Sequence, residues 1–220
     1  MNCKLCGGLG WLFSLSPRGL CDDCERLVTM EAEQHERMAG ESARSADETL
    51  NPHSKITHLD MQVEHLSALA KFEEKGIPTV PEAGKRLEMS RQKRDAVILS
   101  TARSELRDAL KIARDNAALD EKVRLLSQLL LELQEYESRM TEKRPLQIVT
   151  SRVRASLSRV RLSQRLEQAE YAEKAGNKTE ARNLYIEALA ELKGQGPFSL
   201  AKAKRQAEIE ERLRRLDIGA

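Results

Sequence analysis

The sequence is short of aromatic residues and of long apolar runs, and each shortage excludes a class of protein. Of the 220 residues, 3% are aromatic: one Trp, three Tyr and three Phe. Because β-sandwiches and barrels recruit aromatic and β-branched residues, this shortage disfavours both. No apolar run reaches the roughly 18 residues that a membrane-spanning helix requires, so we expect no membrane partner. No apolar segment precedes Cys3, and the lack of a secretory signal predicts a cytoplasmic protein.

Cysteine is absent from most of the chain, and all four cysteines lie near its start, at Cys3, Cys6, Cys21 and Cys24. A reducing cytoplasm keeps thiols free, which favours a metal site over disulfides. Two Cys-x2-Cys pairs, 14 residues apart, can surround one tetrahedral zinc at ~2.3 Å. Four thiolates close the coordination sphere, so we predict one structural Zn²⁺. A redox dithiol, a pair of disulfides and an iron–sulfur site are the alternatives.

The residues around these cysteines indicate the local fold. Residues 11–13 (WLF) are strand-like, residues 16–19 (SPRG) are typical of a turn, and a helical pattern follows Cys24. Residues 1–35 resemble small treble-clef and zinc-ribbon modules, and the resemblance implies a zinc-binding module over residues 1–38. Trp11 and Phe13 are expected to cover the metal.

Residues 39–54 are polar and carry no periodic apolar pattern, so they are predicted to be a flexible linker that tethers the zinc module. His58 and His65 follow, on one face of a helical pattern. Apolar residues already occupy the buried face of this helix, which favours two solvated histidines over a second metal site.

The rest of the chain is rich in strong helix formers, and its apolar residues recur at three- and four-residue steps. The pattern predicts helices over residues 55–75, 82–117 and 119–143, and Pro145 begins another long helical segment. Each helix has one apolar side, so the helices are expected to pack as an antiparallel bundle over residues 55–144 or to assemble with another copy.

Charge is unevenly spread along the chain. Residues 1–84 carry 8 basic and 14 acidic side chains (net −6), whereas residues 85–165 carry 19 and 11 (net +8). Five arginines are candidates for contact with a nucleic-acid backbone: Arg152, Arg154, Arg159, Arg161 and Arg165. The alternatives are pairing with the Glu-rich segment at residues 132–142, or a solvated face.

Residues 165–193 resemble a tetratricopeptide hairpin. The small and large positions of that motif are matched by Ala169, Ala172, Ala181, Tyr185 and Ala188, around a Gly176–Asn177 turn. The resemblance implies closely packed helices in a tetratricopeptide-like region over residues 145–220, with residues 199–216 as its polar capping helix.

The sequence therefore predicts a mostly α protein with an N-terminal treble-clef zinc module. No serine or cysteine is paired with a histidine in a recognisable catalytic motif, so we expect no enzymatic activity. The leading hypothesis is a zinc-binding adaptor that binds a protein partner through its helical region. The alternative is a nucleic-acid-binding or regulatory protein that uses the zinc module and the basic middle segment.

Overall fold

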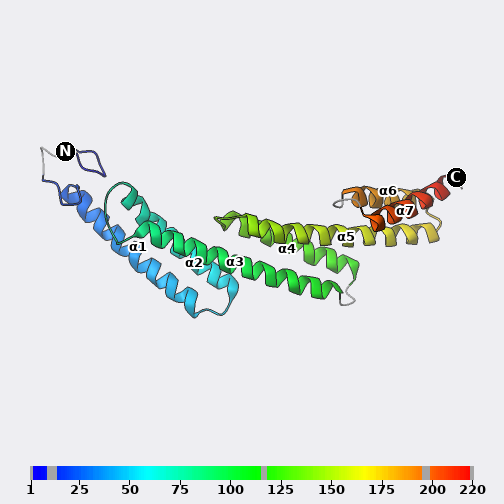
Figure 1. Ribbon diagram of the computed structural model, residues 1–220, viewed down its shortest axis with the longest axis horizontal. Helices are drawn as coiled ribbons and strands as arrows, with labels where there is room; N and C mark the ends of the chain where they lie inside the picture. Colours follow the sequence, from blue (N-terminus) through cyan, green and yellow to red (C-terminus); the bar gives the residue numbers. More distant parts are fainter. Residues whose placement is uncertain (1, 9–13, 115–117, 195–198, 219–220) are drawn as a thin grey trace. The chain divides into compact units, whose positions relative to one another are not determined.

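The computed structural model describes residues 2–8, 14–114, 118–194 and 199–218, and within these residues the regular elements are α-helices, with no strand (Figure 1). The mostly α class predicted from composition is thus confirmed. The helices are α1 (Asp22–Glu48), α2 (Pro52–Glu74), α3 (Ala83–Arg114), α4 (Leu119–Arg139), α5 (Arg144–Lys174), α6 (Lys178–Gly194) and α7 (Leu200–Ile218). None of the helices in the described part of the chain has the length and apolar character needed to cross a membrane.

The chain forms two compact units. Unit 1 comprises Met1–Thr101 and Ser138–Lys143, and unit 2 comprises Ala102–Glu137 and Arg144–Ala220. The division falls within α3 and α4, so it does not follow the helix boundaries.

In unit 1, α1 and α2 lie side by side (Figure 1). Their shared core places Ala32 and Ala39 of α1 against Leu66 and Leu69 of α2, and Leu87 of α3 joins the same cluster. Alanines let two helix axes approach closely, and the larger leucines fill the space that remains.

Helix α1 is longer than the sequence pattern predicts, because residues 39–48 continue it and are not the linker expected there. The buried face of this last part consists of Ala39, Ser42 and Ala46. These side chains are too small or too polar to produce a strong apolar periodicity, although they pack well. Only a short turn, residues 49–51, therefore separates α1 from α2.

Asn51 determines where α2 begins. Its side-chain oxygen accepts hydrogen bonds from the backbone N–H groups of His53 (2.9 Å) and Ser54 (3.1 Å). Pro52 occupies the first turn, where its fixed φ suits a helix and its missing N–H has no intrahelical role.

A buried arginine holds residues 138–143 onto the helices of unit 1. Arg94 is 7% exposed, and its guanidinium lies 3.4 Å from the Asp60 carboxylate and 3.0 Å from that of Asp95. Asp95 also accepts the backbone N–H groups of Thr141 (2.9 Å) and Glu142 (3.2 Å). Both carboxylates thus compensate a buried cation, and Asp95 also caps the turn that leads into α5.

In unit 2, α6 packs against both α5 and α7. The core of these three helices contains the five residues expected at close-packed positions: Ala169, Ala172, Ala181, Tyr185 and Ala188. The helices α5 and α6 are joined at Gly176, whose φ of 81° is the left-handed conformation that glycine adopts without a steric penalty.

Tyr185 links all three of these helices. Its hydroxyl donates to Glu173 of α5 (2.9 Å) and accepts from the Arg212 guanidinium of α7 (3.0 Å). Burial and the hydrogen bond to Glu173 together raise the pKa of Tyr185 to about 12. The neutral phenol is therefore the form that suits this core.

Candidate metal centre

The cysteine segment, defined here as residues 2–8 and 14–24, folds into a compact arrangement through backbone hydrogen bonds. Cys3 N–H donates to the Gly8 carbonyl (2.9 Å), and Lys4 N–H donates to the Gly19 carbonyl (3.0 Å). The second bond places the first cysteine pair beside the turn that precedes the second pair. Gly19 has a φ of 78°, and a Cβ there would lie 3.0 Å from Lys4 Cε, so both conformation and space favour glycine.

The second cysteine pair is positioned by the start of α1. Cys21 is the residue immediately before the helix, and Cys24 lies in its first turn. The backbone N–H groups at a helix start carry partial positive charge, which stabilises nearby thiolates. Residues 11–13, including the predicted cover Trp11 and Phe13, lie outside the described residues.

The structure brings all four predicted ligands together. The four sulfur atoms lie within 4.8 Å of one another, and Cys6 Sγ lies 4.0 Å from Cys21 Sγ. A tetrahedral zinc with Zn–S bonds of ~2.3 Å places its sulfurs about 3.8 Å apart, whereas a disulfide requires an S–S bond of about 2.05 Å. The spacing therefore fits a shared cation, and all four thiols are free.

The thiols of Cys3 and Cys24 have pKa values shifted in opposite directions. Backbone N–H groups of Cys6 and Cys21 point at the Cys3 sulfur and lower its pKa to about 6; the Cys21 N–H lies 3.5 Å from it. A hydrogen bond to the Cys21 sulfur, together with desolvation, raises the pKa of Cys24 to about 12. A cation bound here would displace the protons of all four thiols, so metal binding strengthens as pH rises.

The cysteine segment is packed onto the helices of unit 1. Cys3 and Leu20 are buried in one cluster with Val28 of α1, Phe72 of α2 and Ile77, which lies just after α2. The polar pattern of residues 39–54 predicts a tethered module, but this shared core joins the cysteine segment directly to the helix pair.

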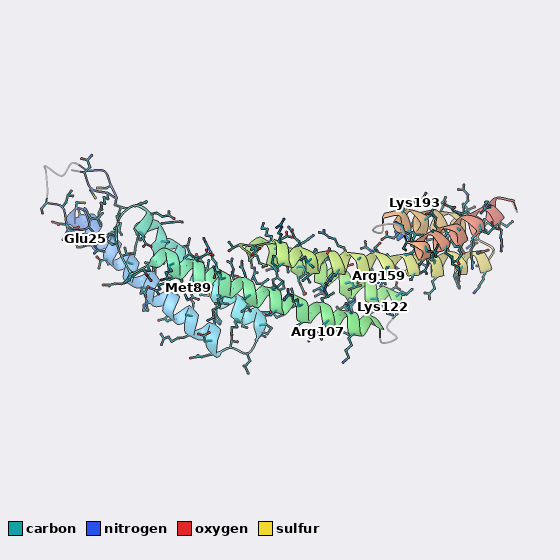
Figure 2. All side chains as sticks on the ribbon, in the orientation of Figure 1. Glu25, Met89, Arg107, Lys122, Arg159 and Lys193 are labelled. Carbon is teal, nitrogen blue, oxygen red and sulfur yellow. The ribbon has the colours of Figure 1, made fainter. Side chains whose placement is uncertain are left out.

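Polar contacts reinforce this packing. Lys4 Nζ donates to the Gly76 carbonyl (2.6 Å). Glu25, labelled in Figure 2, accepts hydrogen bonds from Ser16 (2.8 Å) and Arg18 (2.8 Å), and these bonds lower the pKa of its carboxyl. Sequence reasoning missed these residues, because single Lys, Arg and Glu side chains resemble any solvated surface.

The two histidines named from the sequence do not form a site together. His65 of α2 instead faces His35 of α1, with 3.1 Å between their Nδ1 atoms and ring centroids 5.3 Å apart. Among the described residues, the cysteine quartet is the only group of three or more His, Cys, Asp or Glu side chains close enough to share a metal ion.

The five arginines named from the sequence differ in their surroundings. Arg165 lies 3.1 Å from the Glu187 carboxylate, close enough for an ion pair although not aligned as a hydrogen bond. Arg159 donates to the carbonyl of Ala155 in its own helix (3.2 Å). The others are exposed and make no ion pair or hydrogen bond with a described residue: Arg152, Arg154 and Arg161.

These arginines also occupy two sides of α5. With 3.6 residues per turn, residues seven apart lie on nearly the same side, and residues two apart on nearly opposite sides. One side therefore carries Arg152 and Arg159, and the other carries Arg154, Arg161 and Arg165. A single straight phosphate backbone cannot follow both sides at once.

Comparison of the chain with models of protein families, with curated proteins and with solved structures found no significant match, so the cysteine quartet and the helices are interpreted from their own geometry.

Proposed function

We propose that this protein is a non-enzymatic zinc-binding adaptor, in which Cys3, Cys6, Cys21 and Cys24 hold one structural Zn²⁺ and the helices bind a protein partner. The observation that carries the proposal is the cluster of four free thiols within 4.8 Å. Four sulfur ligands suit zinc, and they leave no coordination position for a reacting water. Because thiolates must stay reduced to bind the ion, we place the protein in the cytoplasm.

The role of the metal follows from how little apolar surface the cysteine segment has of its own. Few of its residues are buried, and Val28 of α1 and Phe72 of α2 contribute part of the core against which it packs. Zinc binding, at about 10–16 kcal/mol in small zinc modules, is large enough to supply the missing folding energy. The order of a turn bearing one pair and a helix bearing the other supports a treble-clef arrangement.

The adaptor role is proposed for the helices of unit 2. Burial of Ala169, Ala181 and Tyr185 between α5 and α6 supports a tetratricopeptide-like hairpin, with α7 as the capping helix. Helical hairpins of this kind present broad, rigid surfaces to other proteins.

The metal is tested by purifying the chain without added zinc and measuring metal content and free thiols together. We expect one zinc per chain, four thiols after chelation, and the visible bands of a tetrahedral tetrathiolate on cobalt substitution. Cys6→Ser should lose the zinc, whereas Ser14→Ala, at an exposed neighbouring position, should keep it. Oxidised thiols or bound iron would contradict the assignment.

The adaptor role is tested by affinity capture from native lysate with the zinc-loaded chain, followed by mass spectrometry and reconstitution with the purified partner. We expect a direct protein complex that survives nuclease treatment. Recovery of nucleic acid alone would contradict the proposal.

Nucleic-acid binding is the second candidate, and it is favoured by three exposed arginines that pair with no described residue: Arg152, Arg154 and Arg161. Binding to a random duplex should then weaken steeply with salt, because each phosphate contact releases a counterion. If the chain does not bind random duplex even at low salt, this candidate is excluded.

A further inference from the structure

A groove within unit 2 has an apolar floor. It lies between the second half of α3 and the first turns of α5 and has a volume of about 850 Å³. Leu106 and Leu110 of α3 line it from one side, and Pro145 and Ile148 of α5 from the other. Ile148 is 58% exposed, which is unusual for an isoleucine beside a buried core. Apolar surface gathered in a concavity indicates a binding site.

Four arginines surround this floor: Arg103, Arg107, Arg144 and Arg152. Each is exposed, and none makes an ion pair or a hydrogen bond with a described residue; Arg107 is labelled on α3 in Figure 2. None of the described residues that line the groove is acidic. The groove therefore combines an apolar centre with an uncompensated positive rim.

The spacing of these residues matches a helical occupant. Arg144, Ile148 and Arg152 follow one another at four-residue steps, so they form a single stripe about 12 Å long on α5. Arg103 and Arg107 are likewise four residues apart on α3, next to the Leu106 and Leu110 pair. An α-helix is about 10 Å wide and can lay an apolar stripe on the floor while its flanks face both arginine pairs.

We propose that this groove binds an amphipathic helix of a protein partner whose apolar stripe is flanked by Asp or Glu. The proposal rests on the adaptor function and specifies its binding surface. Charge complementarity selects the occupant, because carboxylates on both flanks would pair with the four arginines while leucine-like side chains cover Ile148.

A nucleic acid fits the same groove less well. A phosphate backbone would pair with the arginines but would leave the apolar floor uncovered. No aromatic side chain among the described lining residues offers a stacking surface for bases.

The test uses the full zinc-loaded chain and a fluorescein-labelled helical peptide of about five turns, with a leucine stripe flanked by glutamates. Binding is followed by fluorescence anisotropy at low and near-physiological salt. Two control ligands are the same peptide with Gln in place of Glu, and a random RNA of similar length. Circular dichroism checks that each variant keeps its helicity.

Two groove variants are compared with a charge-matched control. The variants are the double substitution Arg103→Glu with Arg107→Glu, and the single substitution Ile148→Glu. The control is Arg154→Glu with Arg161→Glu, which changes the net charge as much as the double groove variant does, on another part of α5. We expect both groove variants to weaken peptide binding about tenfold or more, and the control to stay within about twofold of the wild type.

Several results would overturn the proposal. The proposal fails if the acidic peptide does not bind, or if the Gln peptide binds as tightly as the Glu peptide. It also fails if the groove and control double variants lose the same affinity, or if RNA displaces the peptide from the wild type but not from the groove variants. If the Glu variants lose helicity, Arg144→Gln with Arg152→Gln replaces them as a milder change at the same rim.

The adaptor function is judged separately. One possible result is that a captured partner binds the double variant Arg103→Glu, Arg107→Glu as tightly as it binds the wild type. That result would support the adaptor function and would contradict only the assignment of the groove as its binding surface.

Discussion

Ile77→Ala tests whether the cysteine segment and the turn that follows α2 form one folding unit. Ile77 is fully buried and belongs to the same cluster as Cys3, Leu20 and Phe72. It lies more than fifty residues from the nearest cysteine in the chain, so it cannot act on the metal as a ligand. Any effect on zinc affinity must pass through packing.

The expected magnitude follows from the volume that the substitution removes. Truncating a buried isoleucine to alanine costs about 2–5 kcal/mol. If zinc holds the cysteine segment against Ile77, that loss appears as weaker zinc binding. Because about 1.4 kcal/mol corresponds to a tenfold change, zinc affinity should fall about 30-fold at the lower end of this range.

The assay is zinc competition against a chromophoric chelator, with Ile209→Ala as the matched control. Ile209 is 3% exposed and belongs to the core of α5, α6 and α7, so the same atoms are removed from an equally buried site. The control should lower thermal stability and leave zinc affinity unchanged. Wild-type zinc affinity in Ile77→Ala, or an equal loss in Ile209→Ala, would refute the shared core.

Three further predictions concern the helices. Asn51→Ala removes the cap of α2 and should lower the free energy of unfolding by about 1 kcal/mol, measured by urea titration; no loss would mean that water replaces the cap. Arg94→Leu leaves Asp95, whose side chain is 14% exposed, without its cation, and a loss of about 3–5 kcal/mol is expected by the same measurement; a more stable variant would contradict this. For Tyr185, the folded pKa of about 12 exceeds the ordinary value of 10, so its contribution to stability is complete below pH 10 and is lost as pH rises toward 12. Tyr185→Phe should lack this alkaline loss, and an identical pH profile for the two proteins would contradict the assignment.

Local sequence patterns were sufficient for several features. The Cys-x2-Cys pairs predicted the four residues that the structure brings within 4.8 Å, because the ligands of each pair are held by one turn. The alanines around Tyr185 predicted the close packing of α5 and α6, because small residues at helical spacing form one face. In both cases the information lies within a few helical turns.

The end of α1 shows where such patterns fail. Residues 39–48 contain few large apolar side chains, so their periodicity is weak and they resemble a linker. They are helical because Ala39, Ser42 and Ala46 fit closely against their surroundings. Whether a small residue is buried depends on which side chains of other elements pack against it, and a local sequence pattern does not contain that information.

The sequence by itself determined the helical class, the four cysteines that cluster and the close-packed positions of the α5–α6 hairpin, since each depends on neighbours along the chain. Only the tertiary structure decided that Ile77 packs beside Cys3, that His35 faces His65, and that Arg103 and Arg152 border one groove. The members of each pair lie on different segments of the chain, and they meet because whole elements pack their apolar faces together. That choice is made by the sum of many weak contacts, which no short segment encodes.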